Sequence, residues 1–318
     1  MNELSKEKNF ISAVIYVHNA ENEIIDFLKT VAAILEDNFE KSEIICVNDS
    51  SDDKSVQKIK EVSTEFNQTC IAILNMSYFH GVEVAMTAGV DLAIGDFVFE
   101  FDSTVLDFDK VEIMKVYHKS LEGFDIVSAS PDKAKRKSSS LFYSVFNRFS
   151  HLNYKMTTER FRILSRRVIN RIASMNKTMP YRKPVYAACG LKTTNLTYEI
   201  TAKINEKEDS FTKQFRRKLA GDSFIIFTDL GYRVSVFITS FMLFFTVAVG
   251  IYALVFHLLK NPVSGWTSTI LFVSVSMFFV FMILTIILKY LQILVGLVFK
   301  KTRYSFESIE KLTKQEQT

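Results

Sequence analysis

The sequence predicts an α/β fold, with a mostly parallel sheet covered by helices on both faces and a hydrophobic hairpin at the C-terminal end. Two observations lead to this prediction. Apolar, strand-like runs alternate with amphipathic helical stretches over residues 1–130, which is the pattern of a parallel sheet between two helical layers. Residues 234–299 are then almost free of charge, whereas residues 1–233 have the composition of an ordinary soluble protein.

The expected elements follow one another in a regular order. Strands are expected at 11–17, 43–47, 71–74, 97–101 and 126–128, and helices at about 21–36, 53–66 and 81–94, with a further helix before the last strand. In such sheets, ligands bind beyond the carboxyl ends of the strands. The residues that follow Val17, Val47 and Phe101 are therefore the candidates for a binding site.

Composition excludes several classes of function. The formal net charge of +4 is too small to indicate a nucleic-acid partner. Cys46, Cys70 and Cys189 form no CxxC pair and no cluster with histidine, so a zinc site is not expected. No GxGxxG follows the first strand and no GxxxxGK[ST] occurs anywhere, which excludes a dinucleotide fingerprint and a P-loop.

The C-terminal third is expected to cross a membrane twice. Residues 234–259 form a run of 26 residues without Asp, Glu, Lys or Arg, and as a helix this run would measure about 39 Å against ~30 Å of bilayer hydrocarbon. A second apolar run begins at Trp266 and extends to residue 299, interrupted by Lys289. Basic residues before the first run and after the second predict that both ends lie in the cytoplasm. Residues 216–233 fit either an amphipathic interfacial helix or a soluble packing helix.

Acidic residues follow two of the expected strands. Asn48-Asp49-Ser50-Ser51-Asp52-Asp53 comes after the second strand. Asp102-Ser103-Thr104 comes after the fourth, with Asp107 and Asp109 close behind. Side chains of this kind bind a divalent cation or accept hydrogen bonds from a ribose or a base. They are equally typical of helix caps, so each cluster taken alone leaves both interpretations open.

Taken together, these residues resemble the nucleotide-sugar-binding half of family-2 glycosyltransferases, which have the GT-A fold. Four stretches match the family's motifs in order and spacing: Tyr16 to Glu21, Asn48 to Asp53, Gly81, Ala85 and Gly89 with Gly95-Asp96, and Asp102. Downstream, Ser140 to Tyr143, Asn147-Arg148 and Phe161 to Arg167 resemble polyprenyl-phosphate glycosyltransferases such as dolichyl-phosphate mannose synthase and bacterial undecaprenyl-phosphate glucosyltransferases.

The resemblance implies a function. It implies an inverting transfer of a sugar from a UDP- or GDP-linked donor to polyprenyl (undecaprenyl) phosphate, at the cytoplasmic face of a bacterial inner membrane, with Mg²⁺ or Mn²⁺ as cofactor. It also implies a homo-oligomer, a tetramer in the bacterial relatives. The expected divisions are a catalytic domain at 1–215, a basic juxtamembrane segment at 216–233, two transmembrane helices within 234–299, and a cytoplasmic tail at 300–318.

The resemblance also assigns roles to residues. The metal ligands are expected to be Asp102 and Asp107, and the catalytic residues Asp102 and Glu159, with Glu159 as the base if one is used. The nucleotide-sugar-binding residues are expected to be Val17, Asn19, Glu21, Asn48, Asp49, Asp53, Gly81 and Asp102. The groups expected to bind the acceptor phosphate are Arg136, Ser139, Arg148 and Arg162, in a region, 133–171, with eleven Lys or Arg and a single acid. That region also fits a solvated basic face turned toward an anionic membrane.

Departures from the family pattern leave two alternatives. Asn48 and Thr104 stand where the family has aspartates, and Glu159 lies two residues before Phe161, where the family has an Asp directly before this Phe. The acceptor would then be a hydroxyl of a lipid-linked glycan, which needs a general base, or the chain would be a nucleotide-sugar-binding scaffold without catalysis.

Overall fold

The computed structural model describes most of the soluble part of the chain and one long hydrophobic helix. The described residues are 6–66, 68–132, 159–175, 182–201, 234, 236–242, 244–245, 248, 251, 266–299 and 304–312. The chain divides into two compact units. The first contains residues 1–148, 152–219 and 302–318, and the second contains 149–151 and 220–301.

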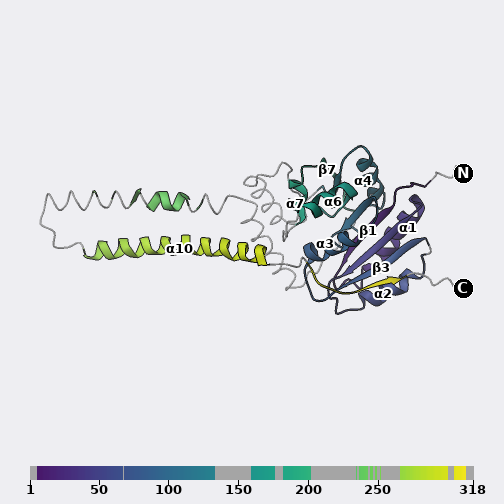
Figure 1. Ribbon diagram of the computed structural model, residues 1–318, viewed down its shortest axis with the longest axis horizontal. Coiled ribbons are helices and arrows are strands. Elements are labelled where there is room, and N and C mark those ends of the chain that lie inside the picture. The colour runs from purple at the N-terminus through teal and green to yellow at the C-terminus, as the bar shows by residue number, and fades with distance from the viewer. Residues whose placement is uncertain are drawn as a thin grey trace. The chain divides into compact units, whose positions relative to one another are not determined.

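The first unit is built on a sheet whose eight described strands lie in the order β7-β5-β6-β4-β1-β2-β3-β8 (Figure 1). The strands are β1 Ile11–Val17, β2 Ser42–Asn48, β3 Thr69–Met76, β4 Phe97–Phe101, β5 Ile126–Pro131, β6 Phe161–Ser165, β7 Thr193–Tyr198 and β8 Phe306–Leu312. Pairing is parallel along β3-β2-β1-β4 and between β5 and β7. The predicted mostly parallel sheet is therefore confirmed. The two antiparallel strands, β6 beside β4 and β5 and β8 beside β3, were not predicted.

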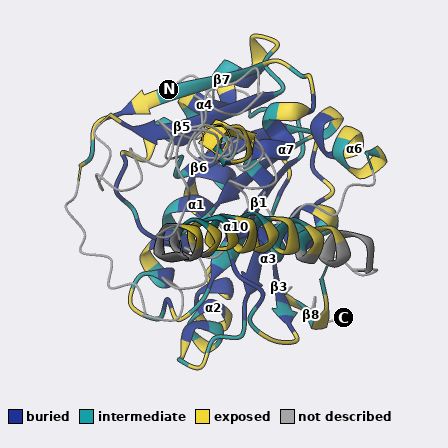
Figure 2. Ribbon diagram, turned by 90° about the vertical axis from the view of Figure 1, so that its left-hand side faces the viewer, coloured by how far each residue is buried: buried dark blue, intermediate teal, exposed yellow. Residues whose placement is uncertain are grey.

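Helices cover both faces of this sheet. They are α1 Ile24–Asn38, α2 Ser55–Ser63, α3 Val82–Leu92, α4 Val111–Leu121, α6 Arg166–Ser174 and α7 Arg182–Ala188. The apolar residues of α1, α2 and α4 pack against one face of the sheet and form one core cluster with the strand residues that point to that face. The apolar residues of α3, α6 and α7 form a second cluster with the strand residues that point to the opposite face. Figure 2 shows the buried strands between these layers. Alternation along each strand thus divides its side chains between two cores.

Gly89 brings α3 unusually close to the sheet. A Cβ atom at this position would lie 2.6 Å from Val47 Cγ2, and closer still to Val14 Cγ1. Both valines are fully buried in the central strands β1 and β2. The glycine therefore sets the distance between α3 and the sheet, and with it the position of the α3 N-terminus.

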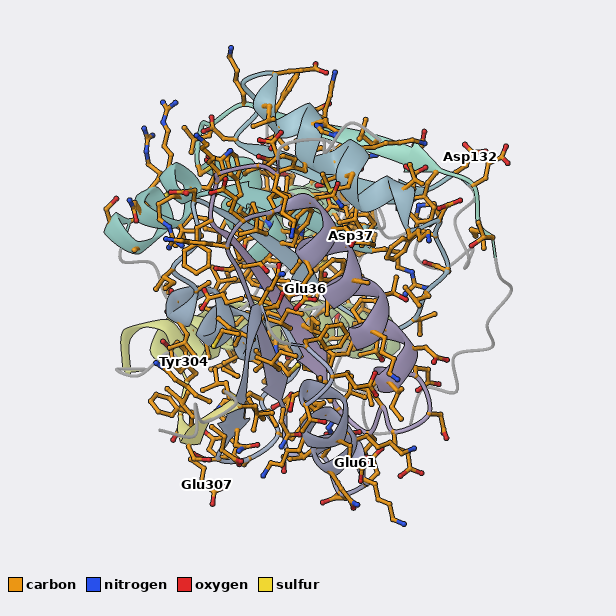
Figure 3. All side chains as sticks on the ribbon, turned by 90° about the vertical axis from the view of Figure 1, so that its right-hand side faces the viewer. Glu36, Asp37, Glu61, Asp132, Tyr304 and Glu307 are labelled. Atoms are coloured by element: carbon orange, nitrogen blue, oxygen red, sulfur yellow. The ribbon has the colours of Figure 1, made fainter. Side chains whose placement is uncertain are left out.

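The last described segment returns to the sheet. Residues 300–318 were expected to be a cytoplasmic tail, but β8 pairs with β3 along most of its length. Tyr304 donates a hydrogen bond from its hydroxyl to Asp91 Oδ2 at 3.1 Å, and Ser77 N donates to Ser305 O at 3.2 Å. Figure 3 labels Tyr304 and Glu307 in this segment. The outer strand of the sheet thus comes from the C-terminal end of the chain.

The second unit is described mainly by α10, Trp266–Phe299, a helix of 34 residues. Large apolar side chains along it are exposed, among them Phe278 (65%), Phe281 (63%) and Leu288 (59%). Among the residues that the structure describes, no helix was found that is both long and apolar enough to cross a membrane.

Candidate active site

Two loops meet beyond the carboxyl ends of β1 and β2. Asn19 N donates to Ser51 Oγ at 3.2 Å, and Asp52 N donates to Asn19 Oδ1 at 2.9 Å. Asn19 and Ser50 have positive φ angles of 50° and 55°, a backbone region that residues other than glycine rarely occupy. Strain of this kind persists where surrounding contacts fix it, so the two loops form one rigid edge.

Asp53 joins the same two loops. Its Oδ2 accepts a hydrogen bond from Glu21 N at 2.9 Å, and its Oδ1 accepts from Ser55 N at 2.9 Å. Burial acts to raise the pKa of Asp53, but the hydrogen bonds from Ser55 and from the Glu21 backbone leave the pKa below its usual value. Glu21 accepts from Lys54 N through Oε2 at 3.2 Å. These contacts are those of an Asp that forms a turn just before α2 and ties it to a neighbouring loop.

Asp49 is fully buried and holds the start of α3. Its Oδ1 accepts a hydrogen bond from His80 N and its Oδ2 one from Gly81 N, both at 2.8 Å, while the Tyr16 hydroxyl donates to Oδ2 at 3.0 Å. Gly81 has φ of 81°, which suits a residue without a Cβ. Asp49 N donates to Val17 O at 2.9 Å. The carboxylate thus fixes the turn between β3 and α3.

Asn48 stands beside this turn at the end of β2. Its Nδ2 donates to Asn75 Oδ1 at 2.9 Å, and its Oδ1 accepts from Ser51 N at 3.1 Å. The residues expected to bind the donor therefore gather at one edge of the sheet. There they contact one another through hydrogen bonds that make this edge rigid.

Asp102 follows β4 at the same edge and is clamped between two arginines. Its Oδ2 accepts from Arg162 Nη2 at 2.9 Å and its Oδ1 from Arg182 Nη2 at 2.6 Å. The side chain is 17% exposed, so it is not sealed in the core. Burial acts to raise the pKa of the Asp102 carboxyl, but the charges of Arg162, Arg182 and Lys183 outweigh it and hold that pKa well below its usual range. The Asp102 carboxylate is therefore ionised at neutral pH.

A buried carboxylate inside β4 binds the same two arginines. Glu100 accepts from Arg162 Nη1 at 2.9 Å, from Arg182 Nη1 at 2.6 Å and from the Tyr186 hydroxyl at 2.7 Å. Burial and the charge of Glu100 raise the pKa of Tyr186 well above its usual value. Glu83 on α3 accepts from Arg182 Nε at 3.2 Å and from the Arg182 backbone N at 2.9 Å. Strand β4, strand β6, α3 and α7 are thus joined by one ionic network.

Glu159 and Arg162 lie together next to Asp102. Glu159 Oε2 is 3.2 Å from Arg162 Nε, an ion-pair distance without the geometry of a hydrogen bond, and Arg162 is only 1% exposed. Burial acts to lower the pKa of Arg162, but the charges of Asp102, Glu100 and Glu159 raise it above its usual value. Of the four residues expected to bind the acceptor phosphate, Arg136, Ser139 and Arg148 lie outside the described residues.

Asp107 belongs to a different cluster. It is fully buried, its Oδ2 accepts from Arg160 Nε at 3.0 Å, and its Oδ1 accepts from the Tyr198 hydroxyl at 3.1 Å. Burial and the charge of Asp107 raise the pKa of Tyr198. Within the described part of the chain, no three His, Cys, Asp or Glu side chains are grouped so as to hold a metal ion.

Sequence reasoning missed four residues of the ionic network: Glu83, Glu100, Arg182 and Tyr186. One signal was available, because Glu100 is a charge inside the apolar strand Phe97–Phe101 and a buried charge requires partners. Arg182 gave no comparable signal, since it lies 82 residues from Glu100 in sequence.

Comparison with known proteins identifies the family. Residues 12–178 match the family described as Glycosyl transferase family 2. The chain belongs to this family. It is therefore a glycosyltransferase, and the resemblance drawn from its motifs is confirmed.

Relatives and a solved structure agree with this assignment. An uncharacterized glycosyltransferase of Bacillus subtilis, YkcC, is 23% identical over 88% of each chain. The bactoprenol glucosyl transferase of Shigella phage SfX is 26% identical over 81% of this glycosyltransferase and 86% of that protein. An uncharacterized glycosyltransferase of Synechocystis is 29% identical, but the match spans only 60% of its length. The fold resembles the mannosyltransferase PcManGT of Pyrobaculum calidifontis, solved with GDP-Man and Mn²⁺, with a TM-score of 0.51, 10% identity and coverage of 93% and 89%.

Proposed function

We propose that this glycosyltransferase moves a sugar from a nucleotide-sugar to a polyprenyl phosphate, with inversion at the anomeric carbon. The observation that carries the proposal is the position of Asp102. Its partly exposed carboxylate follows β4 at the same sheet edge as the loops after β1 and β2. The names of two relatives, a bactoprenol glucosyl transferase and an undecaprenyl-phosphate 4-deoxy-4-formamido-L-arabinose transferase, support a polyprenyl phosphate as acceptor.

The donor is proposed to bind across the rigid edge formed by the loops after β1 and β2. The residues proposed to shape its site are Val17, Asn19, Glu21, Asn48, Asp49, Asp53 and Gly81. Several of their polar groups already bond to one another or to Ser51. A surface that needs no reordering loses less entropy when a nucleotide binds. Asp49 acts in this proposal through the turn that it fixes at Gly81, since its carboxylate is fully buried.

The acceptor phosphate is suited to act without a strong base. Its second pKa is about 6, so it is largely dianionic at neutral pH. One of its oxygens attacks the anomeric carbon, the bond to the diphosphate breaks, and a nucleoside diphosphate leaves with that electron pair. Arginines suit the acceptor because a planar guanidinium donates two parallel hydrogen bonds to phosphate. Arg136, Ser139 and Arg148 are proposed for this role, together with the positive charge of Arg162.

A divalent cation would neutralise charge on the leaving diphosphate, and Mg²⁺ or Mn²⁺ was expected at Asp102 and Asp107. As the described residues are arranged, Asp102 and Asp107 do not fit that ion. Both Asp102 oxygens accept hydrogen bonds from guanidinium groups, and the fully buried Asp107 is bound to Arg160 and Tyr198 in a separate cluster. No step of the proposed reaction is therefore assigned to a metal.

We further propose that residues 234–299 insert into the cytoplasmic membrane as a hairpin, with the catalytic domain in the cytoplasm and residues 216–233 at the interface. The sequence supports this, since residues 234–259 carry no charge and basic residues flank the hairpin. The exposed apolar side chains of α10 also support it, because contiguous apolar surface of this kind is unusual in water. A tetramer, implied by resemblance alone, stays a prediction.

An alternative acceptor is a hydroxyl of a lipid-linked glycan. Glu159 is the observation that favours it, because this carboxylate lies beside Arg162, the partner of Asp102, where a general base would be needed. The mass of the product separates the two reactions. One sugar on polyprenyl phosphate supports the first, and an extended glycan supports the second.

The test uses the full chain in membranes with undecaprenyl phosphate and a panel of UDP- and GDP-sugars. Mass spectrometry of the lipids should find one sugar linked to the phosphate, together with release of a nucleoside diphosphate. Asp102→Asn should reduce turnover by about a hundredfold or more, because it removes the carboxylate that positions the charges of Arg162 and Arg182 beside the proposed donor site. Asp132→Asn, an exposed carboxylate on the same domain, is the matched control and should retain activity. Donor binding without any transfer across the panel would favour the scaffold and refute the proposed reaction.

A further inference from the structure

We infer that Asp102 serves as the anchor of a guanidinium pair, so that this chain binds its donor without a divalent cation at that carboxylate. The inference rests on the proposed function, because it assumes that a nucleotide-sugar is the donor. It assigns Arg162 and Arg182 to the place beside Asp102 where a metal ion was expected.

The first argument is that both oxygens of the Asp102 carboxylate already accept hydrogen bonds. Each oxygen of Asp102 accepts a charged hydrogen bond, at 2.9 Å from Arg162 and at 2.6 Å from Arg182. Mg²⁺ ligated by the same carboxylate would lie at about 2.0–2.1 Å from an oxygen, and therefore close to two fixed positive charges. Like charges at such separations repel strongly in a partly buried site. The repulsion opposes a metal even though a carboxylate has lone pairs to spare.

The second argument is that Glu100 and Glu83 hold the guanidinium groups in addition to Asp102. Glu100 accepts hydrogen bonds from both of them, and the Glu83 carboxylate accepts from the Nε and the backbone N of Arg182. Arg162 lies over the Tyr186 ring, with its Cζ 5.4 Å from the ring centroid. A metal ion at Asp102 would have to move the two guanidinium charges away from the buried carboxylates of Glu100 and Glu83, and breaking buried ion pairs costs free energy. The arginines are therefore fixed and do not swing away when a donor arrives.

The third argument is the lack of further ligands among the described residues. Thr104 occupies the position of the second aspartate in the family's metal motif and is 6% exposed. Asp107 is engaged by Arg160 and Tyr198. Mg²⁺ uses one or two protein carboxylates with near-octahedral geometry, and both oxygens of Asp102 already accept hydrogen bonds from guanidinium groups.

The inference assigns the positive charge for the leaving diphosphate to basic side chains. Lys183 is the residue after Arg182 on α7, it is partly exposed, and its charge acts on Asp102. We therefore expect Lys183→Gln to weaken binding of a nucleoside diphosphate in metal-free buffer by about tenfold, the effect of losing one charge-assisted hydrogen bond. Lys183→Arg should restore most of this affinity, which a merely structural role would not predict.

Mn²⁺ binding to the full chain tests the inference without any donor. Electron paramagnetic resonance should give the same Mn²⁺ binding for the wild type and for Asp102→Asn. A Mn²⁺ site that is present in the wild type and lost in Asp102→Asn would overturn the inference. Arg182→Gln should create a Mn²⁺ site that the added Asp102→Asn removes. Circular dichroism first checks that Arg182→Gln folds. If Arg182→Gln does not fold, the comparison of Mn²⁺ binding between the wild type and Asp102→Asn decides the inference.

Calorimetry with UDP and GDP, in EDTA and in MnCl₂, tests the same point with nucleotide bound. The ratio of the two dissociation constants should be the same in the wild type and in Asp102→Asn. A gain in affinity with Mn²⁺ that Asp102→Asn abolishes would overturn the inference. If neither nucleotide binds in either buffer, the proposed function fails, and the measurement with Mn²⁺ alone still decides the inference.

Discussion

Replacing Gly89 by alanine should push α3 away from the sheet and destabilise the fold. The added Cβ would lie 2.6 Å from Val47 Cγ2 and closer still to Val14 Cγ1, whereas carbon atoms normally approach to about 3.5–4.0 Å. Helix α3 would have to move by about 1 Å, because both valines are buried and stiff at χ1. Overpacking of this kind costs about 1–3 kcal/mol, and the contact with two rigid side chains indicates the upper end.

The helix propensity of alanine offsets about 1 kcal/mol of that cost, so Gly89→Ala should lose about 2 kcal/mol of unfolding free energy. The assay is urea unfolding followed by circular dichroism, since the single Trp lies in α10 and does not report on the sheet. Thr87→Ala is the control on the same helix. It removes only the bond from Thr87 Oγ1 to Glu83 O, and its midpoint should move little. An unchanged or higher midpoint for Gly89→Ala would refute the reasoning.

Three further predictions concern the ionic network and the cysteines. Glu100→Gln should cost about 3–5 kcal/mol in urea unfolding, because it leaves buried guanidinium charge uncompensated, and a loss below about 1 kcal/mol would contradict the buried network. Because the pKa of Asp102 is depressed in the folded state, its contribution to stability is complete above about pH 4 and is lost as the pH falls further. Unfolding midpoints between about pH 2 and 5 should therefore vary less in Asp102→Asn than in the wild type. Burial raises the pKa of Cys46 to about 12, so iodoacetamide at about pH 8 should label the partly exposed Cys70 first, and faster labelling of Cys46 by peptide mass would contradict its burial.

Local patterns were sufficient to predict most of the sheet. Strand β1 was predicted at 11–17 and lies at Ile11–Val17, and β4 was predicted at 97–101 and lies at Phe97–Phe101. These strands are buried on both faces and therefore appear in the sequence as continuous apolar runs. Strand β8 was missed because its burial alternates between exposed and intermediate, so its sequence resembles a polar tail. Its pairing with β3 depends on an edge far away in the sequence.

The candidate site was predictable only where its residues are close in sequence to strand ends. Asn48, Asp49 and Asp102 follow predicted strands, so sheet topology alone brings them to one edge. The partners of Asp102 could not be predicted in the same way. Arg162 had been assigned to the acceptor phosphate from the basic composition of its region, and Arg182 had no assignment. Pairing between charges 60 and 80 residues apart is a property of the folded core.

Strand β8 is the last described strand of the sheet to be synthesised, and this affects how a newly made chain folds. Strand β3 is made early, yet its outer neighbour leaves the ribosome only after the whole apolar segment 234–299. Until then, the backbone N–H and C=O groups along that margin of β3 have no β8 to pair with, and an open margin can recruit other chains. A nascent or truncated chain that stops before residue 304 would therefore be prone to aggregate, even with every residue of the candidate site already made.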